Sequence, residues 1–374
     1  MFLPQYSGEG SAMLMTNLSR APVSDVAAAP VPKAAIKDDM AMIRAASELT
    51  RDLTAANPRI YYADFLGSAL LGYLGVATAI VAQPLWLALA GALVAVLALY
   101  RAGSFIHEIT HIRPGAVPGF RLVWNVLIGV PMLAPSFMYE GIHSLHHNRT
   151  KYGTVEDPEY LPLALMKPWT VPLFVVAAAF APLALLVRYG VLTPLSLLIA
   201  PLRRTVVARY SGLVINPLFR RKPPEGDFAR AWAWQEAGAS AWALTLIIGT
   251  ATGVLPLRAV LIFLGIVSAA LVLNQIRTLV AHLWENDGSV LTVTAQFLDS
   301  VNVPPPGLLP ELWAPVGLRY HAIHHLLPGV PYHHLAEAHR RLAAALPVDS
   351  QYHGANRRGL FGLIGSLMAG AGRR

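Results

Sequence analysis

The sequence contains no cysteine among its 374 residues. This absence excludes disulfide bridges, thiolate ligation of iron, iron–sulfur clusters and cysteine-type zinc sites. Charged residues are also scarce, at 13%, whereas hydrophobic residues make up 55% and the mean hydropathy is +0.49. Several apolar runs approach the roughly 20 residues that cross a bilayer. The composition therefore indicates an integral membrane protein.

Motifs for bound electron carriers are missing as well. The sequence has no GxGxxG dinucleotide motif and no HPGG motif of a fused haem domain, so electrons for any redox reaction must come from another protein. The formal charge is +8, but the arginines lie beside apolar runs and not in an aromatic-interleaved basic patch. We expect them to face the cytoplasm and anionic headgroups, and we expect no nucleic-acid partner. The N-terminus lacks the pattern of a cleaved signal peptide.

Four apolar runs predict two transmembrane hairpins. They cover residues 61–81, 85–102, 239–254 and 259–280. Basic residues before the first run favour a cytoplasmic N-terminus. The run 120–138 is broken by prolines and is expected in the interface. The run 169–200 carries Arg188 and must cross the bilayer twice or not at all. A hairpin and an in-plane or re-entrant arrangement with Arg188 snorkelling fit equally well. The predicted fold is an all-α integral membrane protein with about four transmembrane helices, further interfacial or re-entrant helices, and a cytoplasmic histidine-rich cap.

The chain divides into three parts on composition. Residues 1–58 form a tail, disordered at first, followed by an amphipathic helix on the membrane surface between residues 33 and 53. Residues 59–345 form the membrane domain. Residues 346–374 form a C-terminal tail whose apolar stretch 359–370 is expected to be a helix on the membrane surface.

Eight histidines fall in three tight clusters that read HxxxH, HxxHH and HxxHH. The clusters are His107 and His111; His143, His146 and His147; and His321, His324 and His325. Residues three and four apart share one face of a helix, and neutral imidazole is the commonest metal ligand. A tetrahedral site takes only four ligands. Eight histidines, with His282 as a plausible ninth, therefore predict two ions with coordination above four, which favours iron with positions open for oxygen.

Two other interpretations of these histidines are weaker. His107–His111 also reads HExxH, the signature of zinc metalloproteases, but an intramembrane protease would leave six clustered histidines without a role. A non-catalytic metal-binding membrane protein, such as a metal carrier, should place ionisable ligands within its spans. Here the clusters lie outside the predicted spans.

The three clusters resemble the histidine boxes of the membrane fatty acid desaturases. HEITH, GIHSLHH (141–147) and RYHAIHH (319–325) match in order, spacing and placement over about residues 60–345. The resemblance implies two non-haem iron ions at the cytoplasmic face, with dioxygen as co-substrate. It also implies one additional histidine ligand, and His282 stands at that position. Some relatives have an asparagine four residues earlier, where this chain has Thr278. Residues 299–318 resemble bacterial members, which implies the bacterial inner membrane.

The implied reaction is oxygen-dependent desaturation of a fatty acyl chain, with electrons from an external ferredoxin or cytochrome-type protein and its reductase. An unactivated methylene has no acidic proton and no electrophilic carbon, so its oxidation requires an oxidant made from metal and dioxygen. The rival outcome is hydroxylation of a lipid, alkane or carotenoid by the same apparatus, because substrate geometry decides between them. We expect Glu108, Asp157 and Asp299 to support the ligands, and Arg203, Arg204, Arg220, Arg221 and Lys222 offer a basic surface for an acidic electron donor.

Overall fold

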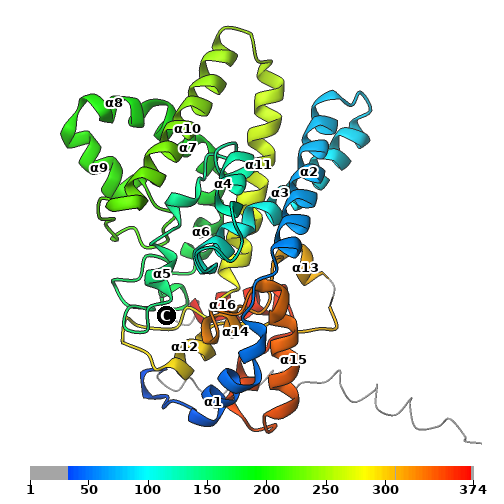
Figure 1. The fold of residues 1–374 in the computed structure, drawn as a ribbon, viewed down its shortest axis with the longest axis vertical. Helices are drawn as coiled ribbons and strands as arrows, with labels where there is room; N and C mark the ends of the chain where they lie inside the picture. Colours follow the sequence, from blue (N-terminus) through cyan, green and yellow to red (C-terminus); the bar gives the residue numbers. More distant parts are fainter. Residues whose placement is uncertain (1–32, 308, 372–374) are drawn as a thin grey trace, which may run out of the picture.

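The computed structural model describes residues 33–307 and 309–371 of the chain. The predicted disordered tail before residue 33 lies outside the described residues. Throughout the described ranges the secondary structure consists of helices, with isolated β-bridges but no strand. Figure 1 shows two regions: long helices above, and a cap of short helices below. The predicted all-α membrane fold is confirmed, because four helical segments of the described chain are long and apolar enough to cross a membrane.

Helices α2 (Pro58–Val81) and α3 (Leu85–His111) form the first predicted hairpin. Asn57 caps α2 by accepting from the backbone N–H of Arg59. Small residues hold the two helices together, as is usual in bilayers: a Cβ added to Gly75 would lie 2.7 Å from the carbonyl oxygen of Gly91 and from the backbone nitrogen of Ala95. Helix α3 runs on to His111, so its C-terminal end carries the first two clustered histidines to the cap, where His111 lies 3.1 Å from His324 of the chain's C-terminal part.

Helices α10 (Gly226–Ala251) and α11 (Leu257–Leu279) form the second hairpin. Only α11 of this pair is among the four long apolar segments, and the prediction of a span at 239–254 is corrected in this respect. The fourth segment is Ala181–Leu198. Helix α10 is not among the four apolar segments because Gln235 and Glu236 lie within it, which leaves its apolar part shorter than a bilayer requires.

The segment between the hairpins is a chain of short helices. It contains α4 (Phe120–Trp124), the π-helix η3 (Asn125–Gly129), η4 (Ser136–Met138), α5 (His143–His146), η5 (Leu163–Leu165), α6 (Thr170–Ala179), α7 (Ala181–Val187), the π-helix η6 (Arg188–Leu192), α8 (Thr193–Leu198) and α9 (Ala200–Tyr210). The run 120–138 is broken as predicted. Helix α9 packs back against α8 (Figure 1), so this segment folds on itself beside α10 and α11.

Arg188 does not snorkel to the interface as predicted. Its side chain is 3% exposed, and its guanidinium pairs with Glu236 of α10 at 2.5 Å. Arg203 binds the other carboxylate oxygen of Glu236 at 2.7 Å. In a medium without water, a charge is stabilised more by a fixed counter-charge than by a long reach to the surface. This ion-pair network therefore fastens the folded-back segment to α10.

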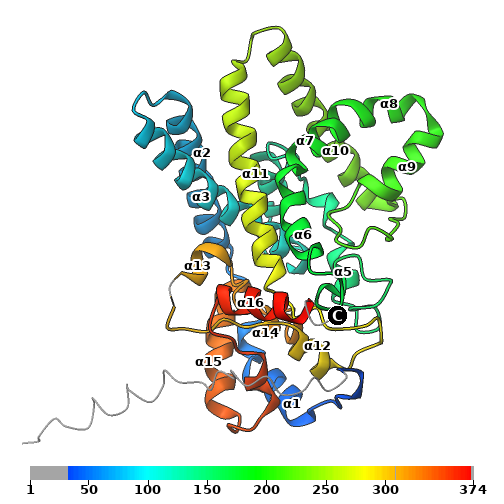
Figure 2. The same cartoon turned by 180° about the vertical axis from the view of Figure 1, so that it is seen from behind.

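The cap combines the first and last described parts of the chain. Its helices are η1 (Lys33–Ala35), α1 (Met40–Leu49), η2 (Arg51–Leu53), α12 (Val293–Asp299), α13 (Pro310–Trp313), α14 (His321–Leu326), η7 (Tyr332–His334), α15 (Leu335–Ala345), η8 (Gln351–Ala355) and α16 (Leu360–Ala371). The predicted amphipathic helix is α1, but it buries Met42 and Ala46 in a core shared with α15 and does not turn this face to lipid. The predicted C-terminal helix is α16, which lies where the long helices meet the cap (Figure 2) and leaves Phe361 exposed.

Candidate metal centre

Four short stretches bring the clustered histidines and His282 to one place beneath the long helices. His107 and His111 lie one turn apart near the end of α3, and the second cluster lies on α5 and its C-cap residue His147. The third cluster lies on α14, and His282 lies three residues after the end of α11. All nine predicted ligands meet, in two groups whose ligand atoms lie within 4.8 Å of one another. The first group is His107, His111, His143, His147 and His324, and the second is His146, His282, His321 and His325.

The rings of each group converge through their Nε2 atoms. In the first group Nε2 of His324 lies 3.1 Å from that of His111 and 3.2 Å from that of His147, which is 3.0 Å from that of His143. In the second group, Nε2 of His321 lies 3.0 Å from that of His282 and 3.2 Å from that of His325. The adjacent residues His146 and His147 belong to different groups, so the second cluster joins the two.

The chemistry of this donor set fits two metal ions. Burial lowers the pKa of His143, His282 and His324 well below the ordinary value, so these imidazoles are neutral at pH 7. The same holds for His147, His321 and His325. Both ring nitrogens of His107 are buried without a hydrogen-bond partner in the described structure. Buried polar atoms without partners are costly, and a cation at the convergence point supplies the missing partner. Five and four ligands leave one and two positions open around six-coordinate ions.

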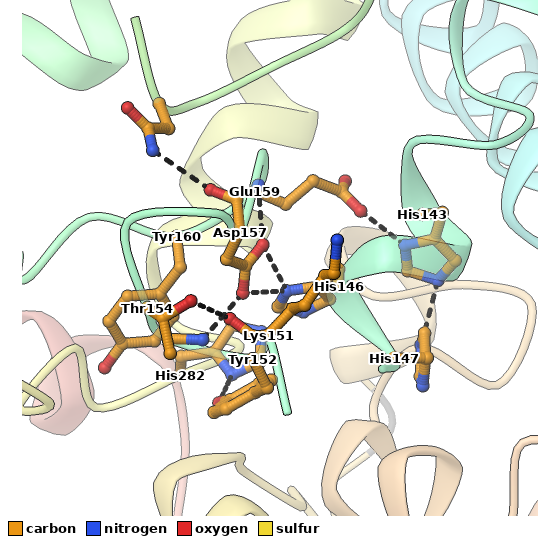
Figure 3. Close-up of polar contacts among 12 residues, drawn as sticks. His143, His146, His147, Lys151, Tyr152, Thr154, Asp157, Glu159, Tyr160 and His282 are labelled. Atoms are coloured by element: carbon orange, nitrogen blue, oxygen red, sulfur yellow. Dashed lines mark hydrogen bonds and ion pairs between the residues drawn. The ribbon is translucent and has the colours of Figure 1, made fainter. Parts of the chain in front are cut away.

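Carboxylates orient the second cluster from a loop that follows it (Figure 3). Nδ1 of His146 lies 2.9 Å from Oδ2 of the fully buried Asp157, and Nδ1 of His143 lies 2.6 Å from Oε2 of Glu159. Each carboxylate accepts the Nδ1 proton, which leaves the Nε2 lone pair free for a metal. Burial opposes a charge on His146, but the carboxylates of Asp157, Glu159 and Asp299 together outweigh it and raise the pKa of this imidazole.

A tyrosine performs the same task for His282. The hydroxyl of Tyr152 donates to Oδ2 of Asp299 at 2.8 Å and therefore accepts the proton on Nδ1 of His282, also at 2.8 Å. Asp299 thus acts through Tyr152 and does not touch a ligand, and Lys33 of η1 forms an ion pair with it. Thr278 lies in the last turn of α11. The hydroxyl of Ser300 lies 3.3 Å from the same Nδ1 atom of His282.

Glu108 does not support a ligating imidazole, as the sequence analysis predicted it would. Its carboxylate accepts from the hydroxyl of Tyr61 at 2.5 Å and from the backbone N–H of Tyr332 at 3.1 Å, whereas Nδ1 of His107 is 3.7 Å away. Consecutive residues on a helix do not face the same side. Glu108 therefore joins α2 to the cap and binds no imidazole.

Sequence reasoning missed Glu159, Tyr139 and Tyr152. The hydroxyl oxygen of Tyr139 lies 2.9 Å from Nδ1 of His143. The loop 148–161 has no periodicity that would place its side chains, and the available signal was the acidic run Glu156, Asp157, Glu159 directly after the second histidine box.

Comparison with known proteins gives two matches. The family described as Fatty acid desaturase matches residues 84–355. A protein of Caulobacter vibrioides (strain NA1000 / CB15N) named Ceramide hydroxylase is 50% identical over 329 residues, which is 88% of this chain and 93% of that protein. No solved structure matches the chain.

Proposed function

Because this chain belongs to the fatty acid desaturase family of membrane proteins, we propose that it hydroxylates a ceramide-type lipid with dioxygen. The observation that carries the proposal is the pair of histidine groups, which supplies ligands for two metal ions, in a chain that is 50% identical to a ceramide hydroxylase. The relative favours the hydroxylation that the sequence analysis held as the rival outcome over the desaturation that it placed first.

The proposed reaction converts a C–H bond, dioxygen, two electrons and two protons into an alcohol and water. Two iron ions, held by His107, His111, His143, His147 and His324 and by His146, His282, His321 and His325, would supply the oxidant. An imidazole binds a metal through its neutral form, so these ligands would add no charge to the ions. The buried carboxylates of Asp157 and Glu159 hold the Nδ1 protons of His146 and His143, and Tyr152 holds that of His282. These contacts fix the rings before substrate arrives.

The burial of the centre serves the same reaction. His107, His143, His146, His282, His321 and His324 are each at most 5% exposed. A site closed by the cap and the long helices excludes water from the oxidant, which protects the substrate radical from side reactions.

The active site is proposed to face the cytoplasm, where an external protein donates electrons. The basic surface predicted for that donor needs revision. Arg221 is engaged internally: it donates to the carbonyl oxygen of Glu140 at 2.6 Å and stacks over Trp232, and Arg203 binds Glu236. Arg204, Arg220 and Lys222 are exposed and remain the residues to test for docking.

The test is metal analysis combined with lipid analysis. The chain is expressed in a ceramide-supplied host, and lipids are compared with those of cells carrying His146→Ala. The proposal expects about two irons per chain and a His146-dependent ceramide that is heavier by one oxygen atom, which carries label when ¹⁸O₂ is supplied. A ceramide or fatty acid lighter by two hydrogens would instead restore desaturation, and a single zinc with no lipid product would refute the oxygenase.

A further inference from the structure

A small cavity lies beside the metal centre and is lined by two buried arginines. It has a volume of about 10 Å³ and is formed by Arg277, Arg319, Trp313 and apolar residues such as Val280, Val301 and Leu318. A volume of this size accommodates roughly one water-sized group.

Both arginines bring an unused donor to this cavity. Arg277 is 9% exposed and Arg319 is 5% exposed, and neither Nε of Arg277 nor Nη2 of Arg319 has an acceptor in the described structure. The other nitrogens of Arg319 are satisfied, since Nε donates to the carbonyl oxygen of Val303 at 2.8 Å and Nη1 to Glu311 at 2.9 Å. A buried charged donor without a partner is costly. Two such donors on one cavity therefore indicate an acceptor that is bound there.

The local charge favours an electron-rich ligand. Arg319 is paired with Glu311, whereas no ion pair joins Arg277 to a carboxylate of the described residues; Arg277 meets the side-chain oxygen of Asn274 at 3.3 Å and hydrogen-bonds with the hydroxyl of Tyr100. A ligand with a strongly negative oxygen would compensate the unpaired charge of Arg277.

Backbone hydrogen bonds connect the residues that line the cavity to the segments that carry His282 and His321. Val301 donates to the carbonyl oxygen of Ala281, next to His282, and Val303 donates to that of Arg319, two residues before His321. Helix α13, which carries Trp313, contacts α3 and α11 where the long helices meet the cap (Figure 1). With the long helices spanning a bilayer, the polar end of a lipid would lie near this level.

We propose that this cavity binds the amide carbonyl oxygen of the lipid substrate and so sets its position against the metal centre. The inference rests on the proposed function, whose substrate class carries one amide. Size decides between acceptors: a carbonyl presents one oxygen with two lone pairs to the two N–H groups, whereas a phosphate brings four oxygens to a space for about one. Arg277 and Arg319 are thus substrate-positioning residues.

Binding without turnover tests the proposal. A short-chain ceramide and its thioamide analogue are titrated into the iron-loaded protein without an electron donor, with tryptophan fluorescence as the readout because Trp313 lines the cavity. The thioamide keeps the planar N–H but offers a larger, weaker acceptor. We expect ceramide to bind at least about tenfold more tightly, as a hydrogen bond to a charged donor predicts. Arg277→Gln or Arg319→Gln should reduce this preference, while Glu311→Gln, which removes no cavity donor, should keep it.

The outcomes separate this proposal from the proposed function. Equal affinity of the wild-type protein for both lipids, or an unchanged preference in both arginine variants, overturns the carbonyl site even if ceramide is hydroxylated. Competition by inorganic phosphate that Arg277→Gln abolishes also overturns it. A preference that depends on the arginines, without a hydroxylated product, supports the site and refutes the reaction. Iron content and thermal unfolding of each variant exclude misfolding, and the two separate arginine variants keep the test valid if one fails to fold.

Discussion

Asp157 gives the sharpest test of how the loop after the second histidine box supports the metal centre. Its carboxylate binds Nδ1 of His146 and accepts the backbone N–H groups of Gly153 and Glu159, both at 2.8 Å. An asparagine has one oxygen in place of two. Asp157→Asn therefore leaves one backbone N–H facing an amide NH₂ group, which destabilises the fold by about 1–3 kcal/mol.

The larger expected effect of Asp157→Asn is on metal affinity. Loss of a carboxylate behind a ligating histidine lowers affinity roughly 10- to 100-fold, or by about 1.4–2.8 kcal/mol. His146 belongs to the second group only, so one ion should dissociate far more easily than the other. A chain whose stability is about 5–15 kcal/mol remains folded.

The assay is iron per chain during dialysis against increasing chelator. Wild-type protein should keep about two irons where Asp157→Asn keeps about one. Glu156→Gln is the matched control, because Glu156 is exposed in the same loop. Glu159→Gln should weaken the first group through His143 instead. Loss of both irons together from Asp157→Asn, or no change in affinity, would refute the assignment of these carboxylates to separate groups.

Three further predictions follow from the fold. Glu236→Gln leaves Arg188 and Arg203 without their carboxylate, and should lower stability by about 3–5 kcal/mol, as breaking a buried ion pair does; a thermal unfolding temperature equal to that of wild type would show that the pair is not buried in the membrane-embedded protein. Gly75→Leu places a side chain where even an added Cβ would lie 2.7 Å from the backbone of α3, so the α2–α3 hairpin should separate and the yield of folded protein in detergent should fall. Gly67→Leu, with open space around the residue, should be tolerated. Burial lowers the pKa of His339 to about 4, so the unfolded state takes up a proton at a higher pH than the folded state does. The stability contributed by the neutral ring is therefore complete above about pH 6.5 and falls by about 3 kcal/mol towards pH 4. The dependence of the unfolding free energy on pH, measured by denaturant unfolding, should be smaller in His339→Gln.

The histidine ligands could be predicted from sequence because spacing on a helix fixes which side chains share a face. His107 and His111 needed only that rule, and the repeat of HxxHH needed little more. Glu108 shows its limit: it is adjacent to a ligand in sequence, yet it points to Tyr61 of the neighbouring helix. Glu159 and Tyr152 lie in an irregular loop, whose side-chain directions depend on tertiary contacts that no local pattern encodes.

The membrane region shows a similar division. Hydropathy predicted the α2–α3 hairpin because both helices are apolar along their length. It misjudged α10, where a charged residue is buried against a partner 48 positions away in the sequence: Glu236 meets Arg188. Long-range ion pairs of this kind cannot be read from the residues on either side.

The shared core of α1 and α15 sets an order of assembly during synthesis. Residues 42–53 pack with residues 297–355 in one core, and Lys33 pairs with Asp299, so the cap cannot form until most of the chain has left the ribosome. The hairpins α2–α3 and α10–α11, whose partners are close in sequence, can form earlier, since local contacts form before distant ones. His321, His324 and His325 are the last ligands to emerge. The metal centre is therefore completed only after the membrane helices are in place, and an ion that binds earlier meets an incomplete and weaker set of ligands.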